Sequence, residues 1–198
     1  MRPITAIRSL FAALVICAWG VAATAESTSA DASHASGPGY ATVDLAELLD
    51  DVGRKSSKQF LVDARVPARV VVGTVDPKRV TYAQLLTILK NNGFAAVPGP
   101  GVVSIVPTSG VRTYAVPIVN KDDGSIADDE WVTRVIPVKL TDANQLVPIL
   151  RSLLPQEAHL ASMPPSHSLL IVDRYANVKR VTAIVQELDV APKKPVSD

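Results

Sequence analysis

The sequence predicts an α+β protein made of two small domains. Two series of short β-branched runs and amphipathic stretches, residues 39–118 and 131–190, flank an acid-rich segment at 119–130. Aromatic residues are only 5% of the chain, so Val, Leu, Ile and Ala supply most of the apolar side chains. This composition is typical of small sheets that pack against a few helices.

A helix is expected at the start of the first domain. Asp44 and Glu47 have the spacing of a capping box, and Gly53 is expected to end the helix. The apolar residues that recur at helical spacing between them are Leu45, Leu48, Leu49 and Val52. Two runs rich in β-branched or aromatic residues, 60–62 and 70–75, then predict two strands.

A second helix is expected further along the first domain. Thr81 and Gln84 repeat the capping-box spacing, and Gly93 supplies a left-handed stop. The apolar stripe between these signals consists of Tyr82, Leu85, Leu86 and Leu89. The strands predicted after this helix are 94–97, 102–106 and an edge strand at 114–118. The predicted order is helix, two strands, helix, and two or three strands.

The second domain has a different predicted order. Residues 131–138 are extended, and Thr141 is expected to cap a helix that Pro148 kinks. The apolar face of that helix consists of Ala143, Leu146, Val147, Leu150 and Leu154. The remaining predicted elements are strands at 160–163 and 169–172 and a last helix that Asp173 caps. Strand, helix, strand, strand, helix is the arrangement of a KH-like fold, but no Gly-x-x-Gly loop with basic neighbours is present for nucleic-acid binding.

The first 25 residues have the pattern of a secretory signal peptide. Arg2 and Arg8 precede an apolar run at 10–21, and small residues follow at 23–25. A retained membrane anchor and a lipid-modified Cys17 are the alternatives. We expect cleavage to release the chain into the periplasm, with residues 26–38 as a flexible leader and residues 191–198 as a disordered tail.

Removal of the signal peptide would change the net charge of the chain and would remove its cysteine. It takes Arg2 and Arg8 from the 20 basic residues, which leaves 18 against 19 acidic ones. Such a near-neutral chain has no electrostatic reason to bind nucleic acid or anionic lipid. It also removes Cys17, the single cysteine, so disulfides and cysteine-based metal sites are not expected.

The side chains that could carry chemistry do not form a recognisable catalytic or cofactor site. His159 and His167 are eight residues apart without a cysteine or an adjacent acid, so surface histidines are favoured over a metal site. The acidic residues of the 119–130 segment are Asp122, Asp123, Asp128, Asp129 and Glu130. Their spacing does not match a calcium loop and favours a solvated linker. We therefore expect no enzyme activity, no cofactor and no metal.

An ordered series of segments resembles the N-terminal periplasmic domains of type II secretion secretins, the general secretion pathway protein D family. The segments of the first domain are 60–63, 66–70, 93–95 and 101–106, and those of the second are 132–138, 146–151, 165–172, 178–180 and 184–189. The resemblance implies a mixed-sheet first domain and a second domain that packs into a ring. It also places partner contacts at Val70, Val72 and Thr74, for which core packing is the alternative role.

The resemblance implies a function through protein–protein contacts. The expected partners are a secretin, the inner-membrane secretion platform or the exported substrate, at an outer-membrane secretion complex. The segments that follow these domains in a secretin, including the gate, do not follow here. We therefore expect no direct pore formation, and an accessory subunit or half of a split secretin. A periplasmic module that binds peptide or peptidoglycan, unrelated to secretion, is the alternative, and a structural spacer is a third.

Overall fold

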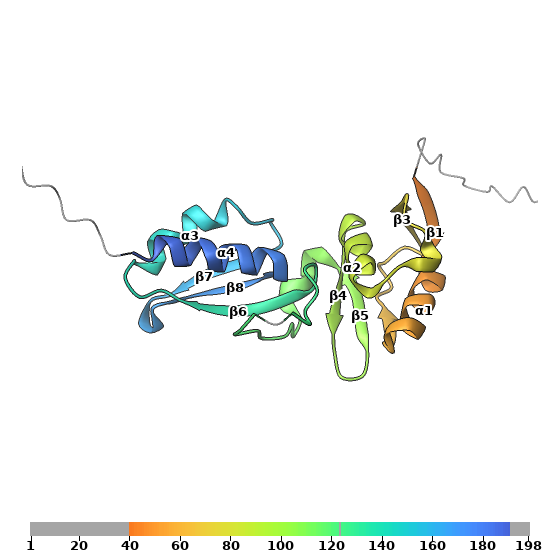
Figure 1. The fold of residues 1–198 in the computed structure, drawn as a ribbon, viewed down its shortest axis with the longest axis horizontal. Helices are drawn as coiled ribbons and strands as arrows, with labels where there is room; N and C mark the ends of the chain where they lie inside the picture. Colours follow the sequence, from red (N-terminus) through yellow and green to blue (C-terminus); the bar gives the residue numbers. More distant parts are fainter. Residues whose placement is uncertain (1–39, 123, 191–198) are drawn as a thin grey trace, which may run out of the picture. The chain divides into compact units, whose positions relative to one another are not determined.

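The computed structural model describes residues 40–122 and 124–190, which belong to one compact unit. The predicted signal peptide, leader and tail lie outside these residues. The described elements follow one another as two α+β groups, residues 41–113 and 131–188 (Figure 1). None of the helices described here has the length and the apolar content needed to cross a membrane.

The first domain contains two sheets and two α-helices. Its strands are β1 (Ala41–Asp44), β2 (Phe60–Val62), β3 (Arg69–Gly73), β4 (Phe94–Pro98) and β5 (Val103–Pro107). Its helices are α1 (Leu45–Ser56) and α2 (Tyr82–Asn91), with 3₁₀ turns at Pro77–Arg79 and Thr108–Thr113. β1 pairs antiparallel with β3 alone, whereas the other sheet has the order β2-β5-β4. Because β2 is parallel and β4 antiparallel to β5, the second sheet is mixed, as predicted.

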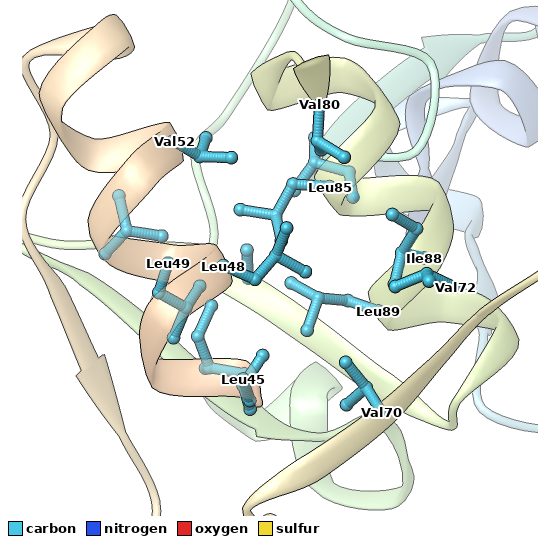
Figure 2. Close-up of a cluster of buried hydrophobic side chains, with 14 residues drawn as sticks. Leu45, Leu48, Leu49, Val52, Val70, Val72, Val80, Leu85, Ile88 and Leu89 are labelled. Atoms are coloured by element: carbon cyan, nitrogen blue, oxygen red, sulfur yellow. The ribbon is translucent and has the colours of Figure 1, made fainter. Parts of the chain in front are cut away.

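The apolar faces of α1 and α2 meet in the core of the first domain. Leucines of both helices, with Ile88 of α2, lie against one another and against Val70 and Val72 of β3 (Figure 2). The predicted capping box of α2 is confirmed: Thr81 Oγ1 accepts from the Gln84 N–H, and the Gln84 side chain accepts from the Thr81 N–H. Gly93 has a φ of +82°, which gives the predicted left-handed stop.

The start and the end of α1 differ in their agreement with the prediction. Asp44 caps the helix as expected and accepts from the N–H groups of Ala46 and Glu47. Gly53 does not end the helix, which continues to Ser56. A Cβ atom at Gly53 would lie 2.7 Å from the carbonyl oxygen of Lys58, so glycine is needed there because the returning chain passes close by.

Two features of the first domain were predicted incorrectly. β1 was not predicted at all, although it supplies half of the β1–β3 sheet. The edge strand expected at 114–118 is absent from this described stretch, where only Ile118 forms an isolated parallel bridge to Thr133. Pro117 still contributes to this bridge, because its carbonyl accepts from the Thr133 N–H at 2.7 Å.

The second domain has the predicted β-α-β-β-α order. Its elements are β6 (Trp131–Pro137), α3 (Ala143–Arg151), β7 (His159–Met163), β8 (Ser168–Arg174) and α4 (Tyr175–Leu188). The three strands form an antiparallel sheet in the order β6-β8-β7. Both helices cover the same face of this sheet (Figure 1), and their apolar residues share its core. The predicted α+β fold of two small domains is confirmed.

Both predicted helix caps of the second domain are wrong by one residue. Asp142, not Thr141, caps α3 and accepts from the Asn144 N–H at 2.9 Å. Arg174, not Asp173, is the N-cap residue of α4, because β8 extends to Arg174. Pro148 lies inside α3 as predicted.

The buried position of Asp173 changes its ionisation. Asp173 is fully buried in β8, and desolvation raises the pKa of its carboxyl group above the ordinary value. Hydrogen bonds from the Arg174 N–H and the Asn177 side chain oppose this shift without cancelling it. Folding therefore disfavours the ionised form of the Asp173 carboxyl group.

Asp189 fixes the end of α4 to the loop between β6 and α3. Its carboxylate accepts from the N–H groups of Lys139, Leu140 and Thr141 at 2.7, 2.6 and 2.9 Å. The Thr141 hydroxyl also donates to the carbonyl of Leu188 at 3.0 Å. Thr141 therefore contacts the end of α4 instead of capping α3.

A third apolar cluster contains residues of both domains. Its members are Ala95, Val97, Val106, Val111, Val116, Trp131 and Val172. Trp131 is fully buried, and the guanidinium of Arg174 lies over its ring at 5.2 Å from the centroid. Within the part of the chain that the structure describes, the indole N–H of Trp131 has no hydrogen-bond partner.

Candidate partner-binding surface

The β1–β3 ribbon, residues 41–44 and 69–73, carries the candidate surface of the first domain. Val43 lies opposite Val70 and Asp44 opposite Arg69, and a bulge separates Ala41 from Thr42. The Leu45 N–H continues the pairing by donating to the Ala68 carbonyl at 2.8 Å. The ribbon has only two strands, so each strand has an outer edge that faces away from the other.

The inward face of the ribbon belongs to the core. Val70 and Val72 are 1% and 4% exposed and lie among the leucines and isoleucine of α1 and α2 (Figure 2). Two of the three residues predicted for partner contact therefore have core side chains. Thr74 lies in the turn after β3, not on the strand as predicted, and its side chain is exposed. The predicted partner-contact role of these three residues stays a prediction.

The outward side chains of the ribbon were missed by the sequence analysis. Val71 is 45% exposed, and Tyr40, just before β1, is 65% exposed. Strand alternation places Val71 on the face opposite to Val70 and Val72. This alternation could have identified Val71 from the sequence, but only if it had been known which of the three consecutive valines face the core.

A groove of about 340 Å³ runs beside the ribbon. It is lined by Tyr40, Val71, Val72, Gly73, Val75, Gln84, Thr87, Ile88, Asn91 and Asn92. No charged residue is among these lining residues. The groove is therefore suited to an uncharged polypeptide segment rather than to an ion or a nucleotide.

The acidic segment between the domains is held by basic side chains. Asp122 accepts from Arg134 at 2.8 Å, and this hydrogen bond lowers the pKa of the Asp122 carboxyl group. Asp128 accepts from Lys179 at 2.6 Å. Asp122 and Asp128 thus already have cationic partners within the protein.

Asp129 connects the acidic segment to α2 of the first domain. It accepts from Lys90 at 2.7 Å and from the Thr87 hydroxyl at 2.8 Å. Partial burial acts to raise the pKa of the Asp129 carboxyl group, but the hydrogen bonds from Lys90 and Thr87 outweigh it and the pKa is lowered. Asp129 is therefore an ionised anchor rather than a free metal ligand.

The two histidines of the second domain lie at the β7–β8 hairpin. His159 is the first residue of β7, and His167 has a left-handed φ of 46° in the connection. Across residues 40–122 and 124–190, no group of three or more His, Cys, Asp or Glu residues is arranged to hold a metal ion.

Two family models match the two domains in order. Residues 39–105 match the GspD-like N0 domain, and residues 133–194 match the bacterial type II/III secretion system short domain. The chain is 32% identical over 148 residues to the secretin XcpQ of Pseudomonas aeruginosa. It is also 32% identical over 162 residues to the secretin ExeD of Aeromonas hydrophila. The chain carries secretin N-terminal domains.

The matched regions cover most of this chain but a small part of each relative. The two alignments cover 74% and 79% of the chain, and 22% and 24% of XcpQ and ExeD. Among solved structures, the type II secretion outer membrane complex of Klebsiella pneumoniae, with PulD, PulS and the PulC HR domain, matches with a TM-score of 0.62 and 29% identity. That match covers 79% of this chain and 27% of the other. The secretin N-terminal domains seen here belong to a family of structural components in protein transport.

Proposed function

We propose that these secretin N-terminal domains act without catalysis, by protein–protein contacts within the type II secretion apparatus. The partners are a secretin, the inner-membrane platform or the exported substrate, and the location is the periplasm. The domains bind other proteins and do not themselves form the pore. They act as an accessory subunit or as one part of a divided secretin. The match to a complex that contains PulD, PulS and the PulC HR domain supports protein partners of this kind.

The observation that carries the proposal is the exposed side of the β1–β3 ribbon. β1 is an edge strand, and such a strand offers backbone hydrogen bonds, whereas the groove beside β3 accepts uncharged side chains. Val71 and Tyr40 add exposed apolar surface at the same place. A small surface of this kind supports transient binding rather than permanent assembly.

Site-specific photocrosslinking in the native host tests this proposal. A photoreactive residue at Val71 is expected to crosslink to a secretion-platform or secretin protein. Val62 in β2 of the same domain is the matched control, because it is also an exposed valine, at 39% against 45%. Crosslinks of equal yield and identity from both positions would refute a specific surface at the ribbon.

The peptide- or peptidoglycan-binding alternative requires converging aromatic and polar groups. Trp131 and Tyr175 are buried, and Tyr40 and Tyr114 lie in different parts of the first domain's sequence. Cell-wall fragments recovered with the purified chain, in the absence of any secretion protein, would favour this alternative over the proposed function.

A further inference from the structure

Residues 126–130 of the acidic segment, here termed the splint, are packed against both domains. Ile126 packs against the core of the second domain, whereas the next residue, Ala127, packs against the core of the first. Glu130 holds this stretch in a turn, because its N–H donates to the Ala127 carbonyl at 3.0 Å and its carboxylate accepts from the Ala127 N–H at 3.4 Å. The splint is therefore a short folded element that belongs to both domains.

The splint caps the first turn of α4. The Tyr175 N–H donates to the Glu130 carbonyl at 2.8 Å. The next N–H, that of Ala176, donates to the Asp128 carbonyl at 2.9 Å. The N-cap residue of the helix, Arg174, makes no side-chain capping bond. The splint thus satisfies two of the donors that a helix N-terminus leaves open, and it brings its acids to the positive end of the helix dipole.

The splint is also bonded to α2 of the first domain. The Asp129 carboxylate accepts from Lys90 at 2.7 Å and from the Thr87 hydroxyl at 2.8 Å. Only 12% of the Asp129 side chain is exposed, so solvent screens these bonds less than it screens a surface pair. The Thr87 hydroxyl carries one proton and has a second acceptor, the Ala83 carbonyl at 3.3 Å. Thr87 can therefore donate to the splint or back to its own helix.

The bonds of the splint differ in kind from the other contact between the domains. The third apolar cluster, which includes Trp131, also joins the two domains. Apolar contact is non-directional, so this cluster favours association without selecting one orientation. A hydrogen bond requires a narrow range of distance and angle. The bonds at Asp129 thus supply the directional contact that the apolar cluster lacks.

We propose that the splint couples the two domains mechanically, with Asp129 as the clasp that connects α2 of the first domain to the first turn of α4 in the second. Asp129 lies between Asp128 and Glu130 in the chain, so a shift of Asp129 displaces both carbonyls that cap α4. The two domains then keep one relative orientation while Lys90 and Thr87 hold the clasp. This coupling is a property of the chain alone and does not depend on the proposed contacts with secretion proteins.

The double variant Thr87→Val/Lys90→Met in the full chain tests the coupling. It removes both donors to Asp129 from the first domain, and both side chains are exposed, so the fold should be retained. We expect the Tyr175 and Ala176 amides, in the other domain, to exchange with solvent about fivefold faster, the factor that about 1 kcal/mol supports. The amide of Ile171, in the centre of β8, should keep its wild-type rate and serves as the internal reference.

Residual dipolar couplings measure the relative orientation of the two domains. In the wild type, the couplings of both domains should fit one alignment tensor, because the clasp fixes a single orientation. In the double variant, the two domains should require two different tensors. Residue-resolved hydrogen exchange and the dipolar couplings are recorded on the same labelled protein.

The variant Lys55→Met is the matched control. Lys55 is an exposed lysine of α1 in the same domain, and its Nζ donates to the Lys78 carbonyl instead of to the splint. This substitution removes the same charge as Lys90→Met without touching Asp129. It should leave the exchange of the Tyr175 and Ala176 amides at the wild-type rate.

Three results would overturn the proposal. The first is unchanged exchange of the Tyr175 and Ala176 amides in the double variant, and the second is equal acceleration in Lys55→Met. The third is a wild type whose domains already require two alignment tensors, and this measurement decides if the double variant does not fold. Because all of these measurements use the chain alone, their failure leaves the proposed contacts with secretion proteins untouched.

Discussion

Replacing Val70 and Val71 separately by alanine separates the core side of the ribbon from its exposed side. Val70 is 1% exposed, so Val70→Ala removes two buried carbon groups. At about 0.8 kcal/mol for each buried group, the loss is about 1.6 kcal/mol, and the cavity left between β3 and the helices adds to it. Val71 is 45% exposed, and Val71→Ala should change the free energy of unfolding by less than about 0.5 kcal/mol.

Urea denaturation followed by far-UV circular dichroism measures both variants. We expect the midpoint of Val70→Ala to fall without a change in the slope m, and the midpoint of Val71→Ala to stay near the wild type. The photocrosslinking partner should still be retained by folded Val70→Ala and lost by Val71→Ala. Equal destabilisation by the two substitutions would refute the assignment of inward and outward faces.

Three further predictions concern charged side chains. The backbone N–H groups of Lys139 and Leu140, with a third from Thr141, lower the pKa of the Asp189 carboxyl group. Its stabilising effect is present above the ordinary carboxyl pKa and is lost as the pH falls through the depressed one, so Asp189→Asn should reduce the fall of the melting temperature at acid pH, and an unchanged fall would contradict this. Burial raises the pKa of the Asp173 carboxyl group, so this group stabilises the fold most below the ordinary carboxyl pKa, and that stabilisation is lost as the pH rises through the raised pKa. The stability of Asp173→Asn relative to the wild type should therefore rise with pH between the two pKa values. A difference in melting temperature that stays constant over this range would contradict the prediction. Lys90→Met should cost less than about 1 kcal/mol of unfolding free energy, and an equal cost in an Asp129→Asn background would show that Asp129 is not its partner.

Helical periodicity and cap chemistry predicted most of the regular elements. The i, i+3, i+4 stripes placed the helices, and Thr81 with Gln84 set the start of α2 correctly. The position of Gly53 was misinterpreted because a glycine can be required by a close backbone approach as well as by a helix stop. Asp173 was misassigned as a cap because an acid after an apolar strand can also remain in the strand, buried.

The candidate surface was harder to predict than the fold. β1 is four residues long and stable only against β3, so its own sequence carries a weak signal. Three consecutive valines do not alternate with polar residues, so the sequence does not show which of them face the core. Packing against α1 and α2 decides that Val70 and Val72 are buried. The bonds from Asn92 to Val71 join residues 21 apart, and no local pattern indicates them.

The parallel pairing of β2 with β5 determines when the mixed sheet can form while the chain is being synthesised from its N-terminus. Phe60 is opposite Val103, so the mixed sheet cannot close until the segment beyond α2 has emerged. Until then, β2 has no strand to pair with and the leucines of α1 are not covered by the mixed sheet, so both are exposed on the nascent chain and can be bound by chaperones. The hairpins β4–β5 and β7–β8, in contrast, each pair residues that are synthesised within moments of each other, so each domain has one local nucleus, whereas β2 must wait for a partner distant in the sequence.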